Sequence, residues 1–257
     1  MEPSPEVLVE QRGATLEVSF NRPDRKNAIN LAMYRSLTAA LLRAKQDATT
    51  RSVLIYGQGG IFTSGNDLND FANASNLQDE NNPIVIFMQA LLSFPKPVVV
   101  AVEGVAVGIG TTLLLHCDLA YGHTDARFAL PFVKLGLCPE YASSYLIPRI
   151  AGAAKASEWL LLGEEFSAQE AKEGNLINSV EAAPLAKARA ACDKFALLPP
   201  AAVRQSKALL KQTTSDNVQR VIDTEIALFA KALSQPEFAE AVGAFFEKRK
   251  PDFSHFE

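Results

Sequence analysis

Short apolar segments alternate with helical segments along the first half of the chain. Runs of β-branched and other apolar residues predict strands at residues 8–9, 15–20, 53–56, 98–102 and 119–122. Between several of these runs the apolar residues recur every three or four positions, which is the period of an amphipathic helix. Strands separated by helices indicate an α/β fold in which most strands pair in parallel.

Two of the predicted helices have clear ends. One begins after Asn30, because an asparagine at the N-cap accepts a hydrogen bond from the first helical turn. The other covers residues 84–92 and ends before the Pro-Lys-Pro segment at residues 95–97, because proline lacks the N–H that continues a helix. Residues 72–82 are rich in Asn, Asp and Ser and are expected to form a loop.

The pattern changes after Leu198, where two prolines open a stretch with little strand signal. Apolar positions in this stretch recur at helical spacing, in residues 218–229 and again in residues 238–246. We therefore predict two parts of the chain. Residues 1–198 form an α/β core, and residues 199–257 form a helical C-terminal subdomain.

Composition excludes several classes of protein. The chain has 257 residues, of which 48% are hydrophobic, and its formal charge of -4 comes without a basic block that would bind nucleic acid. Its three cysteines are unevenly spaced and its three histidines lack ligand spacing, so neither a disulfide framework nor a metal site is expected. Because no membrane span or secretory signal is evident, we expect a cytoplasmic protein with no membrane partner.

The first loop that could bind a ligand is Ser64-Gly65-Asn66-Asp67-Leu68, after the predicted strand at residues 53–56. Gly65 allows backbone conformations that other residues avoid, so a main-chain N–H can turn outward toward a ligand. The same residues are also explained by a simpler structure, a turn into a helix that Asn66 or Asp67 caps.

The second loop, residues 104–110, precedes a predicted helix and contains Gly108 and Ile109. Free N–H groups at a helix N-terminus can stabilise a negatively charged oxygen. Its glycines are spaced by four and two residues, which does not match the dinucleotide-binding pattern. Close packing of the helix against a sheet would explain the glycines equally well.

Together with Asn-Arg-Pro at residues 21–23 and Lys-Asn-Ala at residues 26–28, the two loops resemble the enoyl-CoA hydratase/isomerase, or crotonase, superfamily. The resemblance extends from about Val18 to Pro251. It implies a spiral of repeated ββα units, a C-terminal helical trimerisation region, and an acyl-CoA thioester as substrate. Coenzyme A would be part of the substrate, no separate cofactor would be needed, and the assembly would be a homotrimer or a dimer of trimers.

The resemblance also implies roles for individual residues. The backbone N–H groups of Asn66 and Ile109 would hold the thioester oxygen and stabilise the enolate that forms when carbon 2 loses a proton. Further contacts are expected at Arg25 or Lys26 for phosphate, around Ala28 for adenine, at Phe132 and Tyr141 for the acyl chain, and at Lys248 from a neighbouring subunit. For Lys248, a solvated helix end that complements the helix dipole is an equal alternative.

Glu140 is the candidate base, because it is the only charged residue in the run at residues 135–144. The resemblance to the delta-3, delta-2-enoyl-CoA isomerase branch implies that Glu140 is the catalytic glutamate. The two glutamates of the hydratases correspond to Thr112 and Phe132, which cannot act as carboxylate acids or bases. A carboxylate beside an apolar channel becomes more basic through desolvation. From composition alone, a surface acid in a turn after Pro139 would explain Glu140 equally well.

A single base near a thioester can move a proton from carbon 2 to carbon 4, but it does not readily add water. We therefore predict an isomerase that converts 3-enoyl-CoA into 2-trans-enoyl-CoA in the oxidation of unsaturated fatty acids. Two alternatives are left open. One is an enoyl-CoA hydratase of the same fold that uses another acid, and the other is a noncatalytic acyl-CoA-binding protein.

Overall fold

Two β-sheets lie at the centre of the fold in a computed structural model that describes residues 4–72 and 77–256. The larger sheet has the strand order β1 (Val7–Arg12), β2 (Thr15–Phe20), β3 (Ser52–Gly57), β4 (Val98–Val102), β6 (Leu119–His123) and β9 (Ser179–Glu181). The smaller sheet contains β5 (Val105–Val107), β7 (Arg127–Ala129) and β8 (Glu165–Ser167). The β1–β2 and β7–β8 pairs are antiparallel, and every other pair in these sheets is parallel.

The predicted strands at residues 15–20, 53–56, 98–102 and 119–122 are confirmed, and the strand at residues 8–9 is longer than predicted. The strands missed by the sequence, β5, β7, β8 and β9, have three residues each. Segments this short show no period of their own and exist because a distant segment supplies their hydrogen bonds. The second loop, residues 104–110, therefore contains β5, which pairs in parallel with β7.

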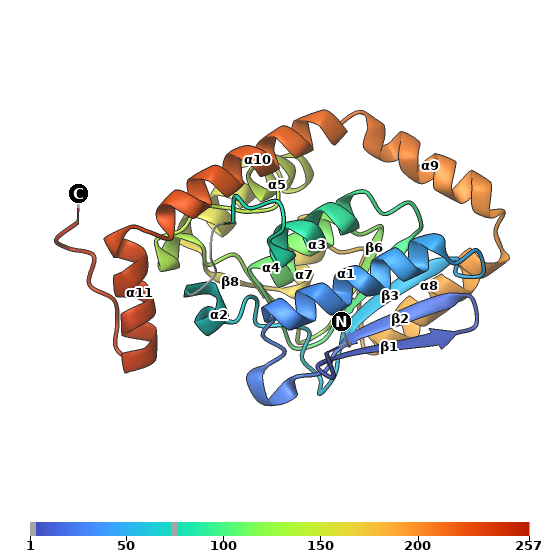
Figure 1. The fold of residues 1–257 in the computed structure, drawn as a ribbon, viewed down its shortest axis with the longest axis horizontal. Coiled ribbons are helices and arrows are strands. Elements are labelled where there is room, and N and C mark those ends of the chain that lie inside the picture. Colours follow the sequence, from blue (N-terminus) through green and yellow to red (C-terminus); the bar gives the residue numbers. More distant parts are fainter. Residues whose placement is uncertain (1–3, 73–76, 257) are drawn as a thin grey trace.

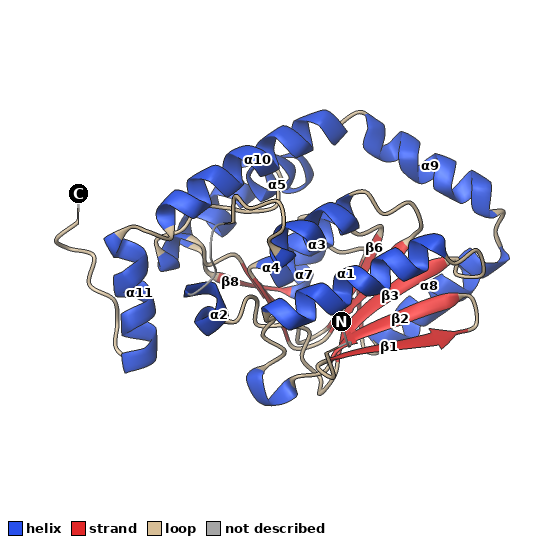
Figure 2. Cartoon of the chain, viewed as in Figure 1, coloured by secondary structure: helices blue, strands red, loops and turns tan. Residues whose placement is uncertain are grey.

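Helices cover both faces of the larger sheet. Helix α1 (Leu31–Gln46) lies on one face and α8 (Pro184–Leu197) on the other (Figure 2). Because successive side chains of a strand point to opposite faces, β3 contributes Val53 and Ile55 to the core on the α1 side and Leu54 to the core on the α8 side. The sequence of β3 and β4 is therefore continuously apolar, as is usual for parallel strands buried on both faces.

The two helices with clear ends are also confirmed. Asn30 caps α1, since its Oδ1 accepts a hydrogen bond of 2.8 Å from the N–H of Met33. The second helix is α3 (Pro83–Leu92), which ends as predicted. The predicted loop at residues 72–82 includes residues 73–76, which lie outside the described residues.

The other helices are shorter or belong to the C-terminal part. They are α2 (Leu68–Ala72), α4 (Ile109–Thr112), α5 (Ser143–Ala151), α6 (Ala153–Ser157), α7 (Ala168–Glu173), α9 (Pro200–Gln212), α10 (Ser215–Ala232) and α11 (Pro236–Glu247). Three-residue and four-residue 3₁₀ turns occur at Pro23–Arg25, Leu113–His116 and Val133–Leu135, and a π turn occurs at Glu158–Leu162. Figure 1 shows α9 and α10 along one side of the core, with α11 beyond them.

A buried lysine joins α9 to the larger sheet. The side chain of Lys207 is 7% exposed, and its Nζ donates to the carbonyl oxygen of Lys96 at 2.7 Å and to Oδ2 of Asp118 at 2.6 Å. The same oxygen of Asp118 accepts from the N–H of Val98 at 2.7 Å. The position where α9 joins the core thus depends on one carboxylate. The division of the chain at residue 198 stays a prediction.

Replacing Asp118 by alanine leaves the ammonium group of Lys207 buried without a carboxylate partner. We expect the free energy of unfolding to fall by about 3 kcal/mol, measured by urea denaturation. The matched control is Glu158→Ala, which removes an exposed ion pair with Lys155 and is expected to change stability by less than about 1 kcal/mol. Equal effects of the two substitutions would contradict the role given to Asp118.

Candidate active site

A cavity of about 590 Å³ opens between the two glycine loops, the segment at residues 131–140 and the C-terminal helices. It brings together most residues that the sequence predicted, namely Arg25, Lys26, Ala28, Ser64, Gly65, Asn66, Asp67, Leu68, Gly108, Ile109, Phe132 and Glu140. Its wall also contains Leu135, Leu137, Phe229, Phe245 and Phe246. Tyr141 and Lys248 are not part of the cavity wall, so its geometry lends no support to their predicted substrate contacts.

The two glycine loops are in direct contact. Thr63 and Ala106 form a parallel bridge, in which the N–H of Thr63 donates to Val105 and the N–H of Val107 donates to Thr63. Gly65 has a φ of +94°, and a Cβ at this position would lie 2.8 Å from the carbonyl oxygen of Val107. Glycine is therefore required here both by the backbone conformation and by the close approach of the second loop.

Each loop presents a backbone N–H that has no acceptor within the described residues. Around Asn66, the N–H of Ile29 donates to the carbonyl of Gly65, and the N–H of Asp67 donates to the carbonyl of Ile29. The N–H of Asn66 itself takes no part in this bridge. Ile109 is the first residue of α4, where an N–H has no partner inside the helix. Both residues line the cavity, so each N–H is available as a donor to a ligand there.

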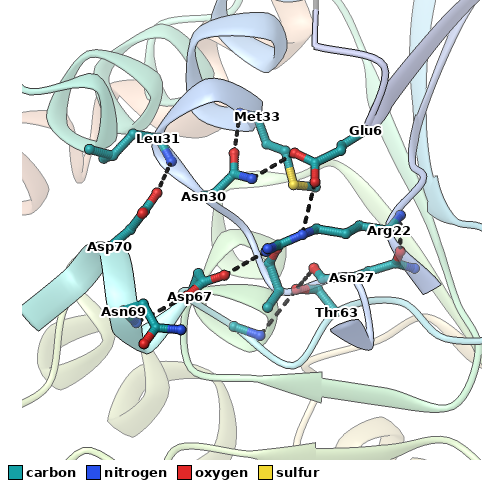
Figure 3. A network of polar contacts seen from close by, with 12 residues as sticks. Glu6, Arg22, Asn27, Asn30, Leu31, Met33, Thr63, Asp67, Asn69 and Asp70 are labelled. Carbon is teal, nitrogen blue, oxygen red and sulfur yellow. Dashed lines mark hydrogen bonds and ion pairs between the residues drawn. The ribbon is translucent and has the colours of Figure 1, made fainter. Parts of the chain in front are cut away.

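A polar network fixes the first loop to the segment that precedes α1 (Figure 3). The guanidinium of Arg22 contacts Oε1 of Glu6 at 2.9 Å and Oδ2 of Asp67 at 2.6 Å, and it donates to the carbonyl of Ala28 at 3.1 Å. Partial burial alone would raise the pKa of Asp67, but the hydrogen bonds from Arg22 and from the N–H of Asn69 lower it. Asp67 thus holds the loop and caps α2, as the simpler explanation of this loop predicted.

Glu140 lies in an apolar part of the cavity wall. It is 8% exposed, and its Oε1 has no hydrogen-bond partner among the described residues. A second, apolar cavity of about 20 Å³ lies next to Glu140, with Met88 of α3 and Phe229 of α10 in its wall. Burial, and to a smaller extent the nearby Glu225, raises the pKa of Glu140 to about 8. The surface position that composition alone suggested is therefore wrong, and the carboxylate has the basic strength of a proton acceptor near neutral pH.

The chain makes an unusual turn directly after Glu140. Tyr141 and Ala142 have φ values of 56° and 57°, in the left-handed region that residues other than glycine seldom adopt. The hydroxyl of Tyr141 donates to the carbonyl of Met88 at 2.7 Å, and its ring stacks on His116 with centroids 3.7 Å apart. Tyr141 therefore supports the turn from within the core.

His116 is buried, and its position is structural. Burial lowers its pKa to about 3, so the imidazole is neutral. Its Nε2 donates to the carbonyl oxygen of Tyr141 at 2.8 Å. In the part of the chain that the structure describes, no group of three His, Cys, Asp or Glu side chains is arranged to hold a metal ion.

The sequence did not identify Glu225, which lies behind the turn on α10. Its carboxylate accepts hydrogen bonds from the N–H of Ala142, from the N–H of Ser144 and from the hydroxyl of Ser144. In the sequence, Glu225 stands among the apolar positions of the predicted helix at residues 218–229. An acid within an apolar face was the available signal, because burial of a carboxylate requires dedicated donors.

Thr112 and Phe132, which the resemblance matched to the two hydratase glutamates, are not acids. Thr112 is fully buried, and its Oγ1 has no partner among the residues described. Phe132 lines the cavity, and its ring lies close to Gly108. A Cβ added to Gly108 would lie 4.0 Å from Cε1 of Phe132. Of the other acids in the described cavity wall, Asp67 is paired with Arg22 and Asp24 is exposed. Glu140 is thus the buried acid of this wall.

The chain belongs to the enoyl-CoA hydratase/isomerase family. The model of this family matches residues 10–255, nearly the whole chain. A solved structure of OdaA from Pseudomonas aeruginosa has a TM-score of 0.91 and 45% sequence identity, and the match covers 94% of this chain and 99% of OdaA. The predicted crotonase fold, a mixed α/β core with C-terminal helices, is therefore confirmed.

Individual relatives have names of two kinds. Enoyl-CoA delta isomerase 2 of Rattus norvegicus is 36% identical over 95% of this chain, which spans 64% of the length of the rat protein. Enoyl-CoA delta isomerase 3, peroxisomal, of Mus musculus is 33% identical over 96% of this chain and 80% of its own length. The 2,3-dehydroadipyl-CoA hydratase of Escherichia coli is 32% identical over 96% of this chain and 98% of its own length. Family membership by itself therefore leaves the reaction open.

No helix within residues 4–72 and 77–256 is both long and apolar enough to cross a membrane.

Replacing Glu140 by glutamine should stabilise the protein in a pH-dependent way. The pKa of Glu140 rises from 4.5 to about 8 on folding, so its ionisation does not destabilise the folded state below pH 4.5 and destabilises it progressively more as the pH rises to 8. We expect the unfolding temperature of Glu140→Gln to exceed that of the wild type by a margin that grows from pH 5 to pH 8 and levels off above pH 8. Glu164→Gln, which alters an exposed acid, should show no such trend. A margin independent of pH would contradict the raised pKa.

Proposed function

We propose that this protein is a delta-3, delta-2-enoyl-CoA isomerase, which moves a double bond from position 3 to trans position 2 of an acyl-CoA. The observation that carries the proposal is the position of Glu140. A buried carboxylate with a partnerless oxygen and a raised pKa lies in the wall of a cavity that also contains two free backbone N–H groups. This is the minimum set of groups for moving a proton next to a thioester.

The proposed reaction begins with binding of the thioester oxygen by the N–H groups of Asn66 and Ile109. Loss of a proton from carbon 2 places negative charge on this oxygen, and each donor is worth about 3 kcal/mol in the transition state. Glu140 accepts that proton and returns it to carbon 4, so the double bond moves into conjugation with the carbonyl. The base ends the cycle in the state in which it began, and no cofactor or metal is required.

The other parts of the cavity suit an acyl-CoA substrate. Arg25 and Lys26 line the cavity and are exposed, so they can meet phosphate groups, and Ala28 lies beside them. The acyl chain would pass Phe132 toward Glu140. We also propose that the chain forms trimers through its C-terminal helices, because the neighbouring rings of Phe245 and Phe246 are 60% and 51% exposed although both line the cavity. A large exposed aromatic side chain at a binding site is typical of an interface.

A hydratase is the second candidate, favoured by the name of the Escherichia coli relative. Addition of water needs a group that activates the water as well as one that delivers the proton. Thr112 and Phe132 cannot supply the second carboxylate, and Asp67 is held by Arg22. The proposal of an isomerase therefore accounts for more of the site.

Glu140→Gln keeps the size of the side chain but removes the base. We expect its kcat for conversion of 3-hexenoyl-CoA into 2-trans-hexenoyl-CoA to fall by about 1000-fold, followed by the absorbance of the conjugated thioester. The control Glu164→Gln should keep wild-type kcat. Near wild-type turnover by Glu140→Gln would refute the assignment. Incorporation of ¹⁸O from labelled water into product from 2-hexenoyl-CoA would favour the hydratase.

The pH dependence of isomerisation should report the base of the free enzyme. Because Glu140 must be ionised to accept a proton and its pKa is about 8, kcat/KM should rise tenfold per pH unit below pH 8 and level off above it. The measurement is kcat/KM for 3-hexenoyl-CoA between pH 5.5 and 9.5. A plateau that is already reached at pH 6 would contradict a base with this pKa.

A further inference from the structure

Helix α5 begins directly after the turn that carries Glu140, and it lacks a capping side chain of its own. Its N-cap residue is Ala142, which has no side-chain oxygen to accept hydrogen bonds from the first turn. Glu225 of α10 takes this place from another element. Its Oε2 accepts from the N–H of Ala142 at 2.5 Å, and its Oε1 accepts from the N–H of Ser144 at 3.1 Å.

The turn itself needs such support. Two consecutive residues, Tyr141 and Ala142, have positive φ, and such backbone conformations persist only where the surrounding structure holds them. Tyr141 is held by Met88 and His116, as described above. Ala142 has no polar side chain, and besides its packing in the core it is held by the hydrogen bond from its N–H to Glu225. Since Ala142 is two residues from Glu140, this contact sets the direction in which Glu140 leaves the turn.

We propose that Glu225 is a positioning residue for Glu140. It fixes the turn that aims Glu140 at the cavity, and it places a second negative charge behind the base. Glu225 is 5% exposed and is not part of either described cavity wall next to Glu140, so it acts through Glu140 rather than on the substrate. The inference rests on the proposed function, because it assumes that Glu140 is the base of the reaction.

The two carboxylates are held in different ways. Burial raises the pKa of both, but three donors oppose this rise at Glu225, whereas Oε1 of Glu140 has no donor among the described residues. When the pair holds one proton, that proton therefore resides on Glu140. The charge of Glu225 then makes Glu140 a stronger base than burial alone would.

Other titratable groups around the pair are neutral in the working range of pH. Tyr34 of α1 and Tyr141 interact electrostatically with Glu140, and burial raises the pKa of both well above the usual value. Cys138 interacts with both acids, and burial raises its pKa to about 11. Among the described residues, Glu225 is thus the charged neighbour that acts on Glu140.

Two substitutions separate the charge of Glu225 from its geometry. Glu225→Gln keeps the volume but removes the charge and turns an NH₂ group toward an N–H. We expect kcat to fall about tenfold with KM within twofold of wild type. We also expect the acid limb, the part of the pH profile in which kcat/KM rises with pH, to move about one pH unit lower. Glu225→Asp keeps the charge but is one methylene short of its donors. It should lose a similar factor in kcat while its acid limb stays closer to that of wild type.

The matched control is Glu17→Gln, which alters a buried acid that Arg12 and Arg189 hold in β2, away from the cavity. It should lose stability but keep the acid limb of wild type. An unchanged acid limb in Glu225→Gln, or a shift of equal size in Glu17→Gln, would overturn the inference. A shift seen only in Glu225→Gln supports it, since loss of folded protein lowers kcat without moving the limb.

A measurement without turnover separates this inference from the proposed function. In protein carrying ¹³C at the glutamate carboxyl carbon, the resonance that is missing from Glu140→Gln belongs to Glu140. Its titration midpoint should be lower in Glu225→Gln than in wild type, whatever reaction the enzyme catalyses. Absence of isomerase activity in wild type would refute the proposed function alone, and an unchanged midpoint would refute the role of Glu225.

Discussion

Burial of one carboxylate, whose Oε1 has no hydrogen-bond donor in the described part of the chain, is the constraint on which this site depends. Removing Glu140 from water makes its charged form costly, and that cost is what raises its basicity toward neutral pH. The fold must offset the cost elsewhere and must prevent the side chain from turning back to solvent. It does so with a turn of left-handed residues held by Tyr141 from the core side and by Glu225 from α10. The burial that raises the basicity of Glu140 therefore also destabilises the fold at this site.

The other half of the site is made of backbone, and for this reason it depends on close packing rather than on particular side chains. The loops around Gly65 and Gly108 approach so closely that a side chain at Gly65 would strike a carbonyl oxygen. The bridge between Thr63 and Ala106 holds the two loops together, and the ladder between β5 and β7 fixes the second loop to the smaller sheet. The ion pairs of Arg22 then fix the first loop to the segment before α1. The side chain of Ile109 is fully buried, and the role that we propose for this residue needs only its N–H.

Much of the fold could be predicted because its signals are local. The apolar run at residues 98–102 is long enough to be recognised as a buried strand, and Asn30 caps α1 with a bond to its own first turn. Strand β5 could not be predicted, because its three residues are a strand only through pairing with β7. Glu225 was missed for the same reason, since its partners are about 80 residues away. Tyr141 was expected in the acyl channel, but the positive φ of its turn directs the ring into the core.

The sequence by itself determined the family, the longer strands and helices, the two loops and the identity of the candidate base, because each is written in a contiguous run of residues. Only the tertiary structure decided which groups meet. It brought both free N–H groups and Glu140 into one cavity, occupied Asp67 with Arg22, and set a second acid behind the base. The physical reason is that basicity and positioning arise from burial and from donors on distant elements, and neither quantity is a property of a residue in its own segment.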